Sequence, residues 1–279
     1  FALQAAIALD TRRCFGRILA AFYTDSSVQV RTRALVHLVQ HDAFGGRKDY
    51  VERGLRDQSA ELCASAARLC ALLPHRDAIA LLGRELNSRS GGIPDTIVET
   101  LADIVQKDVP GTLDRLRKHG TTIQFYARLA SVLDHCTGTD ATTALEGLFQ
   151  YAAAEVRVAS IGPLVRRLGE DAWDLVDQAL RDSSPSVRSR AVRALGTRGN
   201  QDLVQNAPRL LAAVTRAHID PDPEVRSRTA VVLARTGLPG RDRFLLVLES
   251  DDDARVSGIA KRAREELARP GGSSSLSSR

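Results

Sequence analysis

The chain lacks methionine altogether and holds one tryptophan, and aromatic residues make up only 4% of its 279 residues. A thick globular core normally uses more large rings than this. The apolar residues, 43% of the chain, are mostly Ala, Leu and Val, and no stretch alternates polar and apolar residues convincingly as a strand does. This composition predicts an all-α protein whose thin helices pack closely. No apolar run approaches the ~20 residues of a membrane span, so we expect no membrane insertion by this segment.

Cysteine is also scarce, and its four positions are Cys14, Cys63, Cys70 and Cys136. None forms a CxxC pair. Cys63 and Cys70 are seven residues apart, so a helix would place both on one face, where a small apolar thiol is commonly buried. Scattered thiols in a chain of this size indicate a reducing compartment and no disulfide framework. We therefore expect a cytoplasmic protein.

Catalytic signatures are missing too. The chain has no Gly-rich phosphate loop, no GxSxG and no HExxH. His37 and His41 have the i, i+4 spacing that can bring two imidazoles to one metal, with Asp42 next. Because no third ligand is visible in the sequence, the two residues are better interpreted as ordinary histidines on a helix surface than as metal ligands. We therefore predict no enzyme activity, no cofactor and no metal.

What the chain does contain is a repeat, in which an Asp precedes a Val by five positions and an Arg by six. Three clear copies begin at Asp25, Asp182 and Asp220, and a looser copy begins at Asp251. Degenerate copies put Cys63 in the place of the Arg and Tyr151 in the place of the Asp before Val156-Arg157. We call the apolar residue at the Val position of each copy its anchor. With weaker copies near Ile97 and Tyr126, the anchors fall at 30, 62, 97, 126, 156, 187, 225 and 256. This spacing of about thirty residues predicts eight structural units.

Each anchor lies where a helix is expected to begin. Ser184-Pro185 and Asp222-Pro223 place a capping side chain just before a proline at the first helical position. Apolar residues then recur at i, i+4, i+7 and i+8 downstream, and a second amphipathic run precedes each anchor. The predicted unit is a helix, a tight Asp-containing turn, a second helix and a short loop.

The Asp-x-x-x-x-Val-Arg pattern, followed by Ala and Leu at helical spacing, resembles the HEAT and HEAT-like (bilin-lyase type) repeat families. The resemblance implies a right-handed α-solenoid of about eight HEAT-like helical hairpins over residues 1–268, with the second helices lining the concave face. It also implies a polar ladder between neighbouring units. The residues that match its positions are the pairs Asp25/Arg31, Asp182/Arg188 and Asp220/Arg226.

Several segments depart from this pattern. Hairpins three to five match it weakly, and Gly162-Pro163 should break or kink the second helix of the fifth hairpin. The longer interval between the sixth and seventh anchors suggests a longer first helix or an extra turn around Asn200 to Pro208. Residues 269–279 are rich in Gly and Ser and should form a flexible tail. The apolar start, Phe1 to Leu9, suggests a piece of a longer, bacterial protein.

A second set of arginines recurs three positions after the anchors, where it should be free of the ladder. Its members are Arg33, Arg190 and Arg228, and Arg193 and Arg235 extend it along the same helices. Arginine suits bidentate capture of carboxylate or phosphate, although solvent-facing Arg also simply keeps a helix soluble. The chain carries a net charge of only +5. A protein or acidic peptide is therefore the favoured partner, and nucleic acid is the alternative one.

These features favour a non-catalytic protein-interaction scaffold that binds its partner on the concave, Arg-bearing face. An alternative is a nucleic-acid-binding protein resembling the HEAT-like alkylpurine DNA glycosylases, with Trp173 and Asp174 beside the arginines. A third interpretation is a lyase-type chaperone, as in the bilin-lyase relatives, which requires a reactive thiol or a tetrapyrrole-sized pocket.

Overall fold

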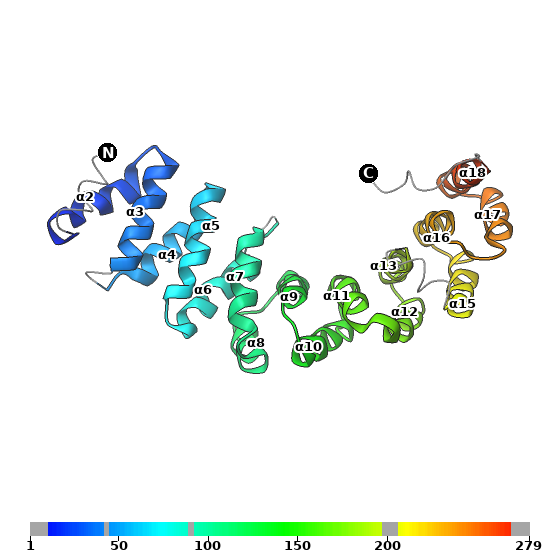
Figure 1. The fold of residues 1–279 in the computed structure, drawn as a ribbon, viewed down its shortest axis with the longest axis horizontal. Helices are drawn as coiled ribbons and strands as arrows, with labels where there is room; N and C mark the ends of the chain where they lie inside the picture. Colours follow the sequence, from blue (N-terminus) through cyan, green and yellow to red (C-terminus); the bar gives the residue numbers. More distant parts are fainter. Residues whose placement is uncertain (1–10, 42–44, 89–91, 197–205, 269–279) are drawn as a thin grey trace. The chain divides into compact units, whose positions relative to one another are not determined.

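The structure is a computed structural model that describes residues 11–41, 45–88, 92–196 and 206–268 (Figure 1). Within these ranges the chain forms α-helices and two short 3-10 turns, and no strand. The expected helix at Phe1 to Leu9 and the expected tail lie outside the described residues. So does most of the long interval around Asn200.

The described helices belong to two compact units, residues 1–144 and 145–279. In the N-terminal unit the second helices of successive hairpins pack in the order α3, α5, α7, α9, and each of α2, α4 and α6 packs on the helix that follows it. The bounds are α2 Thr11–Thr24, α3 Val28–His41, α4 Arg47–Leu55, α5 Ala60–Leu69, α6 His75–Ser88, α7 Asp95–Val105, α8 Val109–Arg117 and α9 Ile123–His135. Helix α10, Thr139–Phe149, spans the boundary between the units.

The C-terminal unit repeats this arrangement. Its second helices pack in the order α11, α13, α16, α18, and the first helices α12, α15 and α17 each pack on the next helix in the chain. The bounds are α11 Ala154–Leu168, α12 Ala172–Ala179, α13 Pro185–Leu195, α15 Ala207–Ala217, α16 Pro223–Arg235, α17 Arg241–Glu249 and α18 Ala254–Ala268. In Figure 1, α13, α16 and α18 follow the inner side of this unit's curve. The predicted all-α solenoid of helical hairpins is confirmed.

The predicted anchors are the third residues of the second helices. Leu62, Ile97, Val156, Val187 and Val225 all occupy this position, and each is fully buried. Val30, the predicted anchor of α3, is only partly buried. In the other second helices, burial of a large apolar side chain at this position ties the helix to its neighbours. The repeat spacing therefore reflects the need to bury an apolar residue near the start of these second helices.

The anchor of α9 is shifted by one residue from the prediction near Tyr126. Phe125 is the third residue of this helix and is fully buried, whereas Tyr126 is partly exposed. An aromatic pair in sequence does not reveal which ring faces the core. With the anchor at Phe125, Arg128 falls three positions after it, in the place that Arg190 and Arg228 occupy in their own helices.

Of the two predicted capping side chains, Asp222 makes its bond and Ser184 does not. The Asp222 carboxylate accepts a hydrogen bond from the main-chain N–H of Glu224, as an N-cap does. Ser184 makes no side-chain capping bond, contrary to the prediction, and instead its own N–H donates to the Asp182 carboxylate at 2.8 Å. The turn before α13 is therefore held by the aspartate two residues upstream.

Helix α11 is not interrupted at Gly162-Pro163, so the predicted break was wrong. Both residues are buried within one helix that runs from Ala154 to Leu168. A proline inside a helix loses a single backbone hydrogen bond and strains the preceding turn. Here packing of the buried segment against α13 offsets that cost. The Arg190 side chain of α13 lies over Gly162.

Candidate interaction surface

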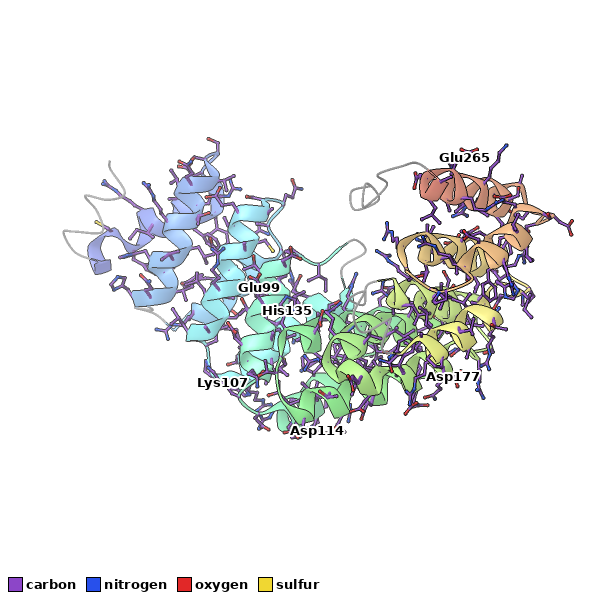
Figure 2. All side chains as sticks on the ribbon, turned by 45° about the vertical axis from the view of Figure 1, so that its right-hand side comes forward. Glu99, Lys107, Asp114, His135, Asp177 and Glu265 are labelled. Atoms are coloured by element: carbon purple, nitrogen blue, oxygen red, sulfur yellow. The ribbon has the colours of Figure 1, made fainter. Side chains whose placement is uncertain are left out.

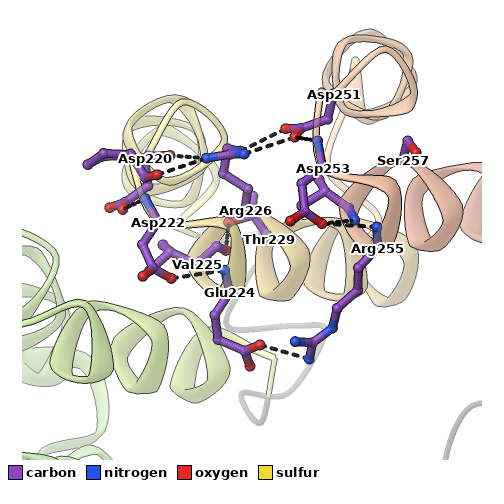
Figure 3. Close-up of polar contacts among 12 residues, drawn as sticks. Asp220, Asp222, Glu224, Val225, Arg226, Thr229, Asp251, Asp253, Arg255 and Ser257 are labelled. Carbon is purple, nitrogen blue, oxygen red and sulfur yellow. Dashed lines mark hydrogen bonds and ion pairs between the residues drawn. The ribbon is translucent and has the colours of Figure 1, made fainter.

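The arginine six residues after each repeat aspartate joins two hairpins. Arg226 of α16 donates through Nη1 to the main-chain oxygen of Asp220, at 2.8 Å, in its own hairpin. Its Nε and Nη2 donate to both carboxylate oxygens of Asp251, at 2.7 and 2.8 Å, in the next hairpin (Figure 3). One guanidinium thus ties the turn of its own hairpin to the turn that follows.

The same contacts recur at three other positions. Arg188 holds the Asp182 main-chain oxygen and the Asp220 carboxylate, the latter at 2.7 and 2.9 Å. Arg157 holds the Asp182 carboxylate at 2.8 Å through both Nε and Nη2. In the N-terminal unit, Arg31 holds the Asp25 main-chain oxygen at 2.9 Å and the Asp57 carboxylate at 3.2 Å.

These contacts correct the predicted pairing. The matched pairs Asp25/Arg31, Asp182/Arg188 and Asp220/Arg226 do meet, but through the main-chain oxygen of the aspartate. The carboxylate partner of each arginine is the aspartate of the following hairpin. The physical reason is reach: the extended guanidinium crosses to the next turn, and a planar fork matches a carboxylate better than a single carbonyl does.

Each ladder aspartate also holds its own turn. Asp251 accepts from the N–H of Asp253 at 2.9 Å in addition to its bonds from Arg226. The hydrogen bond from Arg226 lowers the pKa of the Asp251 carboxyl against the opposing effect of burial. For Asp182, burial raises the pKa, but the hydrogen bonds from Arg157 and Ser184 and the nearby positive charges bring it below its usual value. Both carboxylates are therefore ionised at neutral pH.

Arg157, Asp57 and Asp251 are ladder members that the sequence-based pairing left out. Arg157 follows Tyr151 instead of an aspartate, and it donates to the Tyr151 main-chain oxygen at 2.8 Å. Any residue can supply that carbonyl, so the side chain of the aspartate is needed only for its own turn and for the preceding arginine. The Val156-Arg157 dipeptide was a sufficient signal for this link.

At the ladder positions in the middle of the N-terminal unit, other contacts replace the arginine–aspartate pairs. Cys63 replaces the arginine in α5, and its thiol contacts the main-chain oxygen of Leu55. Asn87 exchanges hydrogen bonds with Thr121 and Thr122, while Gln106 bonds to Thr137 through both its amide nitrogen and its amide oxygen. These contacts explain why the repeat pattern fades here while the hairpins continue to stack.

The five arginines predicted to bind a partner are divided between the two units. Arg33 lies exposed on α3 of the N-terminal unit, and the others lie on α13 and α16 of the C-terminal unit. Arg235 is exposed at the end of α16. Arg228 forms an ion pair with Glu224 at 2.9 Å, and Glu224 also binds Arg255 of α18 at 2.7 Å (Figure 3 draws the latter). A carboxylate thus already compensates part of the charge of Arg228.

Arg190 has a different environment. Its guanidinium lies over Gly162 of α11, where a Cβ atom on residue 162 would come within 2.6 Å of Nη2 and within 3.6 Å of the Arg166 Nη1. Burial lowers the pKa of Arg190, and the positive charges of Arg193 and Arg166 lower it further. Within the described residues Arg190 has no hydrogen bond or ion pair to an acid. Arg190 and Arg166 therefore meet over Gly162 at the α11–α13 contact.

Three arginines in or next to the first helices α12 and α15 of the same unit are paired with acids. Asp177 of α12, labelled in Figure 2, accepts from Arg181 at 2.7 Å and from Arg216 of α15 at 3.2 Å. Asp174 accepts from Arg209 at 3.2 Å. Arg190 differs from these arginines, because within the described residues no acid is paired with it.

The remaining predicted candidates are structural in their surroundings. Trp173 is only 3% exposed, so in this structure it offers no open platform for a base. The rings of His37 and His41 lie 4.3 Å apart, and burial, followed by the charge of His41, lowers the pKa of His37. Among the described residues no group of three or more His, Cys, Asp or Glu side chains could hold a metal, and Asp42 lies outside them.

The cysteines lie mostly in the core. Cys63, Cys70 and Cys136 are buried, and Cys14 is partly exposed; all four are thiols. Burial raises the pKa of Cys70 to about 12, with smaller contributions from Glu85 and Cys63.

No helix in the described ranges is both long enough and apolar enough to span a membrane.

Some proteins of known structure resemble this chain, although no curated protein sequence matches it. Its structure is similar to YibA of Escherichia coli (14% identity, TM-score 0.41, 96% of this chain and 95% of that one). It is also similar to a designed armadillo repeat protein (18%, 0.36, 89% and 98%) and to the complex of CpcE and CpcF of phycocyanin lyase from a Nostoc species (15%, 0.34, 90% and 93%). The family model for HEAT repeats matches residues 172–263. That segment, which contains the ladder arginines Arg188 and Arg226, is therefore similar to HEAT repeats.

Proposed function

We propose that this protein is a non-catalytic interaction scaffold, and that its C-terminal unit binds an acidic protein segment along the second helices α11, α13 and α16. The observation that carries the proposal is the contrast between two sets of arginines. Those of the ladder, and Arg209 and Arg216 of α15, are paired with named carboxylates. Arg190 lies beside Arg166 and has no acid partner in the described part of the chain. A surface with unmatched charge attracts a partner of opposite charge.

The stacked helices support an extended partner. Successive hairpins repeat the same backbone at regular intervals, so side chains on neighbouring second helices form a row that a peptide chain can follow. Arg190 and Arg193 provide the centre of this row. Arg228, half-compensated by Glu224, would contribute less. We further propose a cytoplasmic location, in keeping with four cysteines that are all thiols.

A binding experiment tests the proposal. The probe is a fluorescein-labelled peptide of alternating glutamate and glycine, followed by fluorescence anisotropy at low and at physiological salt. We expect the double variant Arg190→Glu/Arg228→Glu to bind at least tenfold more weakly than the wild type. The matched control is Arg209→Glu/Arg243→Glu, which makes the same charge change on the first helices α15 and α17.

Two results would contradict the proposal. Equal weakening by both double variants would mean that only net charge matters and that no face is specific. Tighter, steeply salt-dependent binding of a duplex oligonucleotide, lost in Arg190→Glu/Arg228→Glu, would instead support the nucleic-acid alternative, because phosphate contacts dominate such affinity.

A further inference from the structure

The first ladder aspartate, Asp25, has no arginine partner among the described residues. Its carboxylate accepts the main-chain N–H of Ser27 at 2.8 Å, which is the turn bond of a ladder aspartate. Four other aspartates make the same turn bond and also accept from an arginine of the preceding hairpin; they are Asp57, Asp182, Asp220 and Asp251. Asp25 therefore has the turn geometry of a ladder aspartate without its guanidinium.

The apolar anchor of the same hairpin is incompletely covered. Val30 is partly exposed, whereas Val187 and Val225, at the equivalent place in α13 and α16, are fully buried. Each of those two helices packs against the second helix of the hairpin before it. The hairpin α2–α3, with which the described residues begin, thus leaves both a ladder carboxylate and an apolar anchor partly unused. We call this the α2–α3 edge.

The opposite edge, at α18, does not complement it. Counted from the anchor, Ser257 takes the place of the ladder arginine, and its hydroxyl bonds within its own helix. Lys261 and Arg264 take the places of Val192 and Leu195, which are buried in α13. Burial of charged side chains without partners is costly. A second copy stacked through α18 therefore could not supply the arginine that Asp25 lacks.

We propose that the α2–α3 edge is an interaction surface for a further helical hairpin whose second helix begins with an apolar residue followed by arginine. The surface continues the contact that joins the ladder hairpins, so its occupant is defined by that contact. The guanidinium would bind the Asp25 carboxylate as Arg226 binds Asp251, and the helix would cover Val30. A planar guanidinium fork matches a carboxylate bidentately. The proposal is independent of the peptide-binding face, because it uses other residues.

The ladder also indicates where such an arginine lies along a chain. It precedes its carboxylate by 25 residues in the Arg157–Asp182 and Arg226–Asp251 links. The same interval counted back from Asp25 ends at the position directly ahead of Phe1. A hairpin joined at this position can therefore be used to test the surface.

The test grafts one of the protein's own ladder segments onto the intact chain. Residues 206–226, which comprise α15, its turn and the start of α16 with Val225-Arg226, are fused directly ahead of Phe1. The matched control graft has serine in place of the grafted arginine. Amide hydrogen exchange of α2 and α3 is followed by mass spectrometry of peptides. We expect exchange at least tenfold slower with the arginine graft than with the serine graft, because local opening then also breaks an ion pair.

Point variants assign the effect to Asp25. Asp25→Asn in the arginine graft should remove most of the difference, because a neutral amide offers one oxygen in place of a bidentate carboxylate. Without a graft the same substitution should leave exchange in α3 nearly unchanged, since the asparagine oxygen still accepts the N–H of Ser27. Asp103→Asn, which removes an exposed carboxylate of α7, is the control and should preserve the difference between the grafts.

Three outcomes would overturn the proposal. Equal exchange with the arginine and serine grafts would mean that the edge does not recognise an arginine-bearing hairpin. Protection of α3 in the ungrafted chain as strong as that of α13 would mean that the edge is already covered. Self-association of the ungrafted chain in analytical ultracentrifugation, lost in Asp25→Asn, would make a second copy the occupant. None of these outcomes affects the glutamate–glycine peptide experiment, so the two proposals fail separately.

Discussion

At the scale of single residues, each ladder arginine makes two kinds of contact with one side chain. Arg188 binds a carbonyl of its own hairpin and a carboxylate of the next, and both charged groups are largely shielded from water, at 13% and 7% exposure for Arg188 and Asp220. A buried ion pair contributes little net stability compared with an apolar pair, but loss of one partner leaves the other charge unsatisfied. The ladder should therefore be sensitive to the removal of one partner.

Replacement of Arg188 by methionine tests this sensitivity. Methionine keeps much of the side-chain volume but leaves the Asp220 carboxylate without its bidentate partner. We expect a loss of about 2–4 kcal/mol in the free energy of unfolding, measured by urea denaturation. Arg181→Gln, which breaks an ion pair whose arginine is 62% exposed, should cost less than about 0.5 kcal/mol. Similar losses in both variants would show that burial of the pair is irrelevant.

Acid should weaken the ladder. Because Arg226 lowers the pKa of Asp251 in the folded protein, this carboxylate stabilises the fold at pH values above its unfolded pKa of about 3.9. That stabilisation is lost as the pH falls through the lower, folded value. We expect a melting temperature that is steady between about pH 5 and 7 and that declines below about pH 4. Arg226→Gln should decline less steeply over the acid range, and an equally steep decline would contradict the assignment.

Thiol reactivity should follow burial. Cys63, Cys70 and Cys136 are buried, and the pKa of Cys70, raised to about 12, keeps that thiol protonated at about pH 8. Because the thiolate is the reactive form, we expect a thiol reagent to modify Cys14 first and the other three only on unfolding. Rapid reaction of a second thiol in the native protein would revive the lyase-type interpretation.

At the scale of elements, different hairpins are joined by different polar contacts, and Arg31 and Asp57 form a ladder pair in the N-terminal unit as well. The C-terminal unit uses arginine and aspartate, whereas α6 and α9 of the N-terminal unit are joined through Asn87 and the threonines before α9. Neutral amides carry no desolvated charge, so this link should be less costly to lose than a ladder pair.

Asn87→Ala should therefore have a moderate effect. The substitution removes the hydrogen bonds to Thr121 and Thr122, which lie partly in water, so we expect a loss of about 1–2 kcal/mol by urea denaturation. Gln40→Ala, a similar truncation at an exposed position of α3, is the control and should change stability by less than about 0.5 kcal/mol. A loss as small as that of the control would mean that water replaces the amide contacts.

At the scale of the molecule, a repeat array is stabilised mainly by contacts between neighbours. A local defect should therefore have local consequences. In Arg226→Gln we expect amide hydrogen exchange to accelerate in α16, α17 and α18, measured by mass spectrometry of peptides. Exchange in α3, α5 and α7 of the N-terminal unit should be unchanged. Uniform acceleration along the whole chain would contradict nearest-neighbour stabilisation.

The amino-acid sequence by itself determined the helical class, the period of about thirty residues and the position of nearly every second helix. It could do so because an apolar anchor and a turn aspartate recur wherever two helices must pack. The anchor at Phe125 and the continuity of α11 through Pro163 needed the structure, since local sequence does not show which ring or which turn is packed.

Only the tertiary structure decided which groups the arginines contact. The repeat pattern already separated Arg188, as a ladder residue, from Arg190, two positions further along the same helix. In space one reaches a carboxylate of the next hairpin, while the other lies over Gly162 beside Arg166 and Arg193. A side chain's partners come from neighbouring hairpins about thirty residues away, and that proximity is created by stacking, which no local pattern records.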